Sequence, residues 1–180
     1  MAEAEHRQRS FLALWPDREL QSALAEWGRS CQARSGGRLT PEHNLHATLV
    51  FLGDLVATQV DAVCECVARL PPPRTTVQLD RVGFWPKPGI VWAGSRASSD
   101  ALAAYAESLR DGLRRLGFRL DTRPWVLHVT LIRRARRRPR IEIVPLTWTC
   151  SEVVLVSSTL DTDGAHYEHL RRWSAPVDMG

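Results

Sequence analysis

The sequence predicts a mixed α and β protein built from two similar lobes around a central cleft. Patterns typical of strands and helices alternate along the chain. One short strand pattern, which carries a histidine and then a threonine two places later, occurs twice. The two histidines, His46 and His128, lie 82 residues apart, close to half of the 180 residues. We therefore expect each lobe to contribute one copy of this strand to a shared site.

The first half of the chain contains two strands, each followed by a helix. A strand is expected from Ser10 to Trp15, because this run is almost wholly apolar. Asp17 then begins a helix that ends near the glycines at 36 and 37. The first histidine strand, 45–52, is followed by a second helix over about 58–70, where three consecutive prolines end it.

The second half begins with a hairpin, since turn residues separate strand patterns over 75–84 and 90–93. A third helix is expected from a cap at 98–100 to about 116, and the second histidine strand follows. Three further strands are expected over 141–144, 150–159 and 167–173, with a turn at Asp161–Gly164 between the last two.

Length and composition predict a single domain over residues 1–180. The hydrophobic fraction of 44% is enough for a packed core, and the charged fraction of 24% is ordinary for a soluble protein. No run of eighteen apolar residues occurs, so no membrane-spanning helix is expected. The N-terminus does not have the pattern of a secretory signal, and the four cysteines match no zinc-binding spacing. Both observations favour a cytoplasmic protein with reduced thiols.

The net charge of +4 and the isoelectric point of about 9.2 favour an anionic partner. Almost all of the positive charge comes from arginine, because Lys87 is the only lysine. Arginine suits bidentate contacts with phosphate better than lysine does. The densest basic run is 133–140. Two interpretations remain open for it, a solvated loop or a contact with an RNA backbone.

The repeated pattern suggests acid–base chemistry. Side chains two places apart on a strand share a face, so His46 lies with Thr48 and His128 lies with Thr130. Imidazole titrates near neutral pH, so two histidines can supply one proton and accept another. Hydrolysis of a phosphodiester has this requirement, and threonine hydroxyls can donate to the phosphate oxygens. We expect the two pairs to hold a phosphate group between them.

Zinc binding and simple core packing are the alternatives to this paired site. Two neutral histidines can bind zinc, but a zinc site needs three or four ligands. No Asp, Glu or Cys lies beside His46 or His128 on the same strand face, so neither a metal nor a cofactor is expected. The histidines can also be core residues whose rings bond to backbone carbonyls. The duplication of the pattern in matched strands favours the paired site.

Five segments carry a resemblance to a known family. They are the opening strand 9–16, the motif Asn44–Gly53, the hairpin Gly83–Trp92, the second motif Leu127–Ile132 and the closing segment Gly164–Trp173. Together they resemble the two-histidine (2H) phosphoesterase superfamily. Within it, the chain is similar to the bacterial RNA 2',3'-cyclic phosphodiesterases, the LigT-like family also known as 2'-5' RNA ligases. The resemblance covers nearly the whole chain.

This resemblance implies a bilobal α+β fold with antiparallel sheets and flanking helices around the cleft. It implies hydrolysis of a 2',3'-cyclic phosphate, on an RNA end or a small cyclic nucleotide, to a 2'-phosphomonoester without a cofactor. By matching positions, His46 is the proton donor to the leaving 3'-oxygen and His128 is the proton acceptor that activates water. Thr48 and Thr130 hold the phosphate. Leu127 departs from the family, which usually has proline there, and is expected to loosen the placement of His128.

Other residues are weaker candidates for substrate binding. Arg123 is expected either to reach the substrate or to pair with Asp121, and Trp125 either to stack on a base or to pack at the edge of the cleft. Arg133 is not expected to contact the phosphate directly, because strand parity puts it on the face opposite His128 and Thr130. Three more histidines have no partner motif and are expected at the surface: His43, His166 and His169.

Two alternative functions remain open. The first is a 2'-5' RNA ligase, which without ATP would run the cyclic phosphate chemistry in reverse. An ATP-dependent ligase needs a nucleophilic lysine, and Lys87 lies in a proline-rich turn that does not suit this role. The second is a non-catalytic protein that binds RNA ends through the run 133–140. A monomer is expected in each case.

Overall fold

The computed structural model describes residues 7–160, 162 and 164–176. Its helices are α1 (Arg18–Ser35), α2 (Ala57–Ala68) and α3 (Asp100–Arg115), with a 3-10 turn η1 (Glu42–Asn44). Its strands are β1 (Gln8–Leu14), β2 (Arg38–Leu39), β3 (Ala47–Leu55), β4 (Thr75–Leu79), β5 (Arg81–Trp85), β6 (Ile90–Gly94), β7 (Val129–Arg133), β8 (Leu146–Cys150), β9 (Glu152–Leu160) and β10 (Ala165–Ser174).

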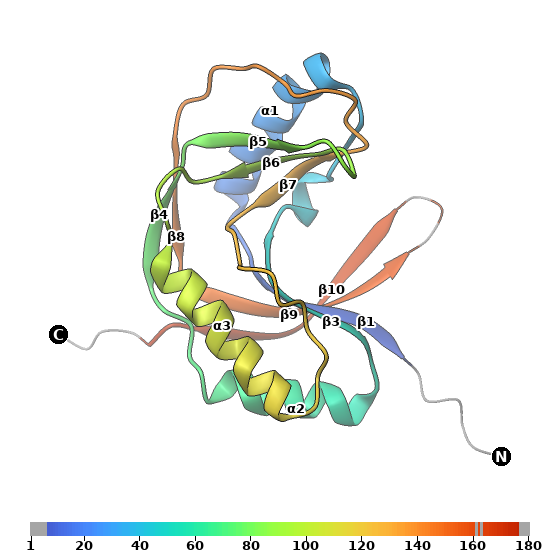
Figure 1. Cartoon of the computed structure of the whole chain (residues 1–180), viewed down its shortest axis with the longest axis vertical. Helices are drawn as coiled ribbons and strands as arrows, with labels where there is room; N and C mark the ends of the chain where they lie inside the picture. The colour runs from blue at the N-terminus through green and yellow to red at the C-terminus, as the bar shows by residue number, and fades with distance from the viewer. Residues whose placement is uncertain (1–6, 161, 163, 177–180) are drawn as a thin grey trace.

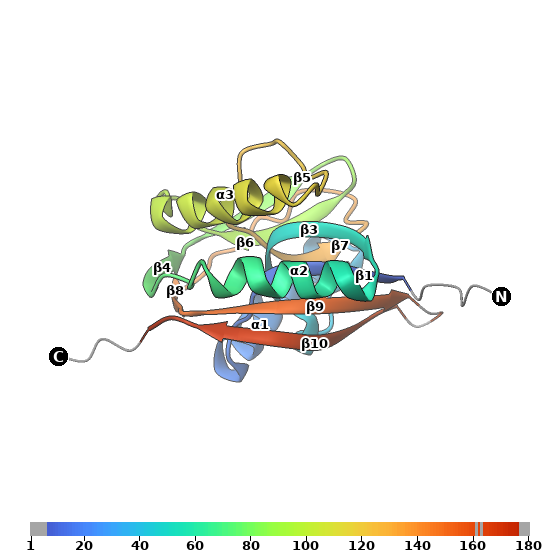
Figure 2. The ribbon, with the colours of Figure 1, turned by 90° about the horizontal axis from the view of Figure 1, so that it is seen from below.

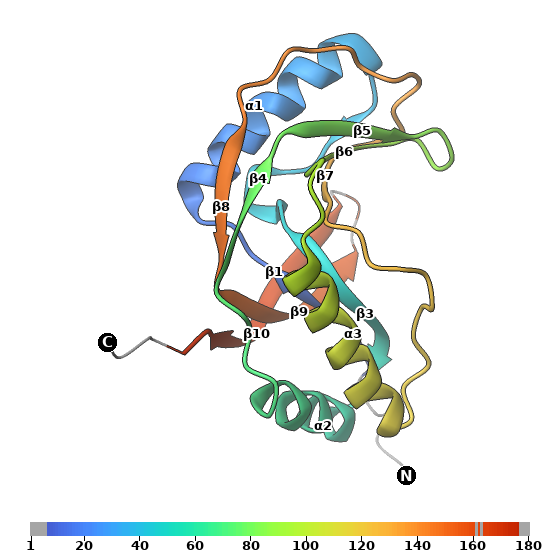
Figure 3. The same ribbon diagram turned by 60° about the vertical axis from the view of Figure 1, so that its left-hand side comes forward.

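The chain folds into two lobes, each built on a four-stranded antiparallel sheet (Figure 1). The lower sheet has the strand order β10-β9-β1-β3, and the upper sheet has the order β2-β7-β6-β5. A separate ribbon of β4 and β8 runs between the lobes (Figure 3). The predicted α+β class with two antiparallel sheets is therefore confirmed, and each H-x-T strand belongs to a different sheet.

The helices cover the outer faces of the two sheets. Helices α2 and α3 lie side by side on the outer side of the lower lobe, which Figure 2 shows from below. Helix α1 packs on the upper lobe, where Gly28 lies against Leu131 of β7. Asp17 caps the start of α1 by accepting from the N–H of Leu20 at 2.8 Å, and Gly36 ends it with a positive φ of 65°. Because the helices pack on the outer faces, the inner faces of both sheets point toward the junction of the two lobes.

One main hydrophobic core runs through both lobes, and a smaller cluster lies on the inner face of the lower sheet. The smaller cluster consists of Phe11, Ala13, Val154 and Val156, with Trp15 and Tyr167 packed against it. It arises because alternate residues of β1 point to opposite faces, so Phe11, Ala13 and Trp15 turn away from the main core. The inner face therefore presents aromatic rings to the junction.

Two expected elements differ in the structure. The strand predicted over 75–84 is divided at Asp80, because β4 pairs with β8 while β5 pairs with β6. The prediction of a strand over 141–144 is wrong. Ile141 and Ile143 pack against the core without strand pairing, and the strand is β8, immediately after Pro145. Of the predicted turn at 161–164, Asp161 and Asp163 lie outside the described residues.

Candidate active site

His46 lies between the turn η1 and the first residue of β3. Its Nδ1–H donates to the carbonyl oxygen of Asn44 at 2.7 Å, because a carbonyl can only accept. This bond leaves Nε2 unprotonated in the neutral ring, where it accepts from the Thr48 hydroxyl at 3.1 Å. The turn itself is anchored, since the Asn44 amide donates to the carbonyl of Ala165 at 2.9 Å. These local bonds thus fix both the orientation and the tautomer of this imidazole.

Three aromatic side chains surround the His46 ring. Trp15 stacks on it at 5.0 Å with nearly parallel planes, and Phe11 stacks at 4.9 Å. Tyr167 meets it edge-on at 5.4 Å. All three belong to the inner face of the lower sheet, so the imidazole of His46 packs against the smaller hydrophobic cluster.

His128 occupies the matching place immediately before β7. Its Nδ1–H donates to the carbonyl of Val126 at 2.9 Å, so its Nε2 is also left for chemistry. One aromatic ring, Trp85, approaches it edge-on at 4.9 Å. Leu127, which stands in place of the family's usual proline, is only 5% exposed and packs in the main core. A buried leucine therefore anchors the backbone at this point.

Strands β3 and β7, which carry the two H-x-T motifs, approach each other at the junction of the lobes. The indole N–H of Trp125 donates to the carbonyl of Thr48 at 2.9 Å and so joins the segment before His128 to strand β3. A charge on His128 lowers the pKa of His46, which places the rings within electrostatic reach of each other. Thr130 shares its strand face with His128, and Trp92 pairs with it across the sheet.

Burial dominates the protonation of both rings. It lowers the pKa of His46 to about 4, against the opposing effect of the bond to Asn44. Burial also lowers the pKa of His128 from its ordinary value of 6.5. The charge of Arg133 lowers the pKa of His46 further, and so does protonation of His128 or of His169. Both rings of the pair are therefore neutral near pH 7 when no anion is present.

The charge of Arg133 reaches this site, although strand parity alone predicts no direct contact with the phosphate. It lowers the pKa of both His46 and His128, which places Arg133 within electrostatic reach of each ring. Arg133 is the last residue of β7, and its exposed side chain is long enough to turn toward the junction. Strand parity fixes the direction of a Cβ atom but not that of a guanidinium at the far end of a flexible side chain.

His169 is a second residue that sequence analysis missed. It is half-buried rather than at the surface, its ring meets Trp15 edge-on at 4.2 Å, and its charge lowers the pKa of His46. Its Nδ1 accepts from Arg172 at 2.6 Å, and Arg172 in turn pairs with Glu152 at 2.7 Å. The sequence did contain a signal for His169. Tyr167 and His169 are two places apart in the closing strand, so their side chains lie on the same face. His43 and His166 are exposed, as predicted.

Arg123 and Trp125 take the second of the two roles expected for each. Arg123 forms a bidentate pair with Asp121, whose pKa falls well below its usual range because of this hydrogen bonding. The Arg123 side chain is 86% exposed. Trp125 uses its indole N–H to bridge the two lobes and packs against the main core.

Other features bear on ligands and environment. Within the described ranges, no three His, Cys, Asp or Glu side chains gather in a group suited to a metal ion. Among the same residues, no helix is long and apolar enough to cross a membrane. All four cysteines are free thiols, as predicted.

A two-lobed antiparallel fold in which each lobe supplies one H-x-T strand defines a two-histidine phosphoesterase. A family model described as LigT-like phosphoesterase matches residues 14–92. The RNA 2',3'-cyclic phosphodiesterase of Escherichia coli K12 is 30% identical over 169 residues, covering 93% of this chain and 96% of that protein. The protein of the same name from Thermus thermophilus is 31% identical over 185 positions, covering 96% and 92%. The chain belongs to the LigT-like phosphoesterase family.

Solved structures agree with this assignment. The crystal structure of Escherichia coli LigT complexed with 3'-AMP matches with a TM-score of 0.84 and 29% identity, covering 94% of this chain and 98% of that one. The crystal structure of the Thermus thermophilus protein TT0787 matches with a TM-score of 0.75 and 26% identity, covering 92% and 97%. Matches of this extent include both lobes of the fold.

Proposed function

We propose that this protein hydrolyses a 2',3'-cyclic phosphate, on an RNA end or a small cyclic nucleotide, to a 2'-phosphomonoester. The observation that carries this proposal is the matched pair of imidazoles. Each donates Nδ1–H to the carbonyl two residues before it, and each keeps Nε2 for proton transfer. The names of the relatives, which are RNA 2',3'-cyclic phosphodiesterases, support the same substrate class.

The reaction needs two proton transfers at one phosphorus atom. His128 takes a proton from water as the water oxygen bonds to phosphorus, and the bond from phosphorus to O3' breaks. His46 gives its proton to O3', which leaves as a hydroxyl. Thr48, Thr130 and Arg133 donate to the non-bridging oxygens as charge develops on them. No metal ion is needed, because the five-membered ring of the substrate is strained.

The low pKa of His46 determines when it can act as the acid. In the free protein, burial first of all, and the charge of Arg133 as well, keep the ring neutral near pH 7. A bound phosphodiester brings a negative charge between these groups and raises the pKa of His46. Binding of the substrate therefore favours protonation of His46, which supplies the proton that the leaving group needs. Near pH 7 the His46 ring is charged only when an anion is bound.

Phe51 provides a surface for a nucleobase beside the reacting phosphate. It pairs in register with Phe11, whose ring stacks on His46, and its own ring lies 6.0 Å from Phe11. Phe51 is 63% exposed, which is unusual for a large apolar side chain that borders a core cluster. An exposed aromatic face next to a phosphate site suits base stacking of any nucleotide.

The decisive experiment is incubation with 2',3'-cyclic AMP, with and without EDTA. We expect 2'-AMP as the product, identified by phosphorus NMR, at the same rate in both conditions. Formation of 3'-AMP would contradict the assignment of O3' as the leaving group. Absence of turnover with both the mononucleotide and an oligonucleotide that ends in a cyclic phosphate would refute the proposed activity.

A further inference from the structure

A large hollow of about 1000 Å³ lies on the upper lobe at the edge formed by β5, and the residues that line it include neither histidine of the pair. Its floor and walls come from the start of β5, the end of α1 and the stretch 138–143 that passes over the upper lobe (Figure 1). Five arginines line it: Arg34, Arg81, Arg96, Arg138 and Arg140. We call this hollow the arginine groove.

The charge of the arginine groove is largely uncompensated. Two carboxylates, Asp80 and Glu142, also line it, so three positive charges remain in excess. Within the described part of the chain, none of the five guanidinium groups has a carboxylate at salt-bridge distance. Asp80 instead accepts from the backbone N–H of Arg96 at 2.8 Å. Guanidinium groups gathered without acidic partners favour a bound polyanion.

A continuous track of side chains joins this groove to His128. Trp85 contacts the His128 ring at 4.9 Å and Trp92 at 5.2 Å. The Arg81 guanidinium lies 5.3 Å from the Trp92 ring centre, and Arg81 also lines the groove. Gly83 makes the track possible, because a Cβ at that position would meet the Trp92 ring at 2.1 Å. The track runs from His128 to Trp85 at the end of β5, crosses to Trp92 on β6 and returns to Arg81 at the start of β5, four residues or about 13 Å along that strand.

The track also contains a donor that lacks an acceptor. The indole N–H of Trp92, a residue only 6% exposed, has no hydrogen-bond partner within the described residues. A buried indole N–H usually finds one.

We propose that the arginine groove and this track bind the phosphate backbone of single-stranded RNA upstream of its cyclic end. The inference rests on the proposed function, since it places the last nucleotide at the two histidines. Basic grooves bordered by aromatic rings are typical of sites for single-stranded nucleic acid. Guanidinium groups match phosphate oxygens bidentately, and the span of the track suits a few nucleotides.

The test compares two substrates, 2',3'-cyclic AMP and a short RNA oligonucleotide that ends in a 2',3'-cyclic phosphate. The double variant Arg138→Ala/Arg140→Ala should raise the KM of the oligonucleotide about tenfold, because two phosphate contacts are lost. The slope of log KM against log salt for the oligonucleotide should fall by about 1.4, or about 0.7 for each contact. The KM of the mononucleotide should not change, since a mononucleotide does not extend into the arginine groove.

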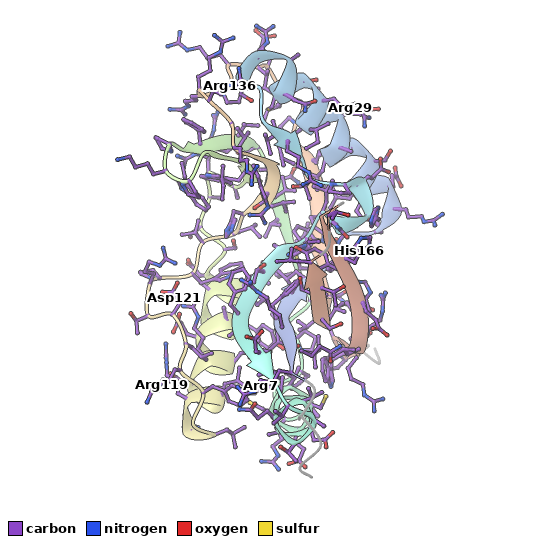
Figure 4. The ribbon with its side chains drawn as sticks, turned by 90° about the vertical axis from the view of Figure 1, so that its right-hand side faces the viewer. Arg7, Arg29, Arg119, Asp121, Arg136 and His166 are labelled. Carbon is purple, nitrogen blue, oxygen red and sulfur yellow. The ribbon has the colours of Figure 1, made fainter. Side chains whose placement is uncertain are left out.

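A matched control is the double variant Arg115→Ala/Arg119→Ala, which removes the same charge from the lower lobe (Figure 4). The variant Arg34→Ala/Arg96→Ala removes two arginines from another part of the groove. It should raise the KM of the oligonucleotide as Arg138→Ala/Arg140→Ala does. Three results would each overturn the proposed role of the groove. They are an equal rise of KM for both substrates, an equal rise of KM in the control variant, and an unchanged KM for the oligonucleotide in an active protein. Loss of all turnover in the wild type would instead overturn the proposed activity.

Discussion

The two H-x-T segments share their local geometry and differ in what surrounds them. In both, the ring Nδ1–H donates to the carbonyl of the residue two places earlier, at 2.7 Å for His46 and 2.9 Å for His128. Around His46 lie Phe11, Trp15 and Tyr167, whereas one ring, Trp85, approaches His128. The strand motif therefore sets orientation and tautomer, while the surrounding lobe sets the pKa.

This difference fits the two roles that we propose for the histidines. Burial lowers the pKa of both rings, and for His46 it reaches about 4. A ring that is neutral until an anion arrives suits an acid that is charged by its own substrate. The less enclosed His128 lies beside exposed Val126, where water can approach. The predictions that follow test whether the environment assigns the roles as proposed.

Loss of either ring should have the largest effect. His46→Ala and His128→Ala should each lower kcat roughly 10²–10⁴-fold with 2',3'-cyclic AMP. A phosphodiester with a 4-nitrophenolate leaving group should separate them, because this group departs without a proton. His46→Ala should then recover most of its rate and His128→Ala should not. The exposed His43→Ala is the control, and recovery by His128→Ala instead would reverse the two roles.

Arg133→Ala should have the next largest effect, a loss of about 10²-fold in kcat, as for removal of a group that stabilises charge in the transition state. It should also raise the pKa of both histidines, because the Arg133 charge now lowers both. NMR titration of the ring resonances measures this shift. Arg136→Ala, in the same basic run and at the far end of the upper lobe (Figure 4), should leave both values unchanged. Unchanged values in Arg133→Ala would remove it from the site.

The pH dependence should reveal the effect of substrate on His46. The free protein is active when His46 is protonated and His128 is neutral, and both pKa values lie below 6.5. Both limbs of the kcat/KM profile should therefore lie below pH 6.5. The alkaline limb of the kcat profile should lie at least about one pH unit higher, because the bound anion raises the pKa of His46. Coincident alkaline limbs would contradict this coupling.

Removal of a stacked ring should have a smaller effect. Trp15→Ala should let water reach His46 and raise its pKa from about 4 toward the ordinary value, while the pKa of His128 stays constant. Trp85→Ala should raise the pKa of His128 alone, by less. NMR titration of both variants measures the two shifts. If either variant changes the pKa of both histidines equally, the environments of the two rings are not independent.

The smallest effect on the rate should come from Leu127. Leu127→Ala should lower the free energy of unfolding by about 2–4 kcal/mol, because it leaves a cavity in the core. The kcat should change only slightly, since the Nδ1 bond of His128 goes to the backbone of Val126 rather than to this side chain. Urea unfolding gives the first quantity, and the exposed Leu116→Ala is the control. A large loss of kcat at unchanged stability would show that Leu127 positions the ring directly.

The sequence by itself determined most of the fold and the centre of the site. Period-two alternation placed each Thr beside its His, and caps and prolines bounded the three helices close to where they lie. Strand pairing was less predictable: Ile141 and Ile143 alternate as a strand does, yet they pack on the core while Leu146–Cys150 pairs with β4. Pairing depends on which partner edge is free, and that is a property of the assembled sheets.

The tertiary structure alone decided which distant side chains tune the two rings. Trp15 and Tyr167 come from opposite ends of the chain, and only the neighbouring strands of the lower sheet bring them to His46. The contribution of Arg133 depends on a long side chain, and that of His169 depends on strand β10 lying in the same sheet as β1, which carries the neighbouring Trp15 just beyond its end. Local sequence fixes which way a Cβ points, whereas burial and charge at a ring are sums over the whole fold.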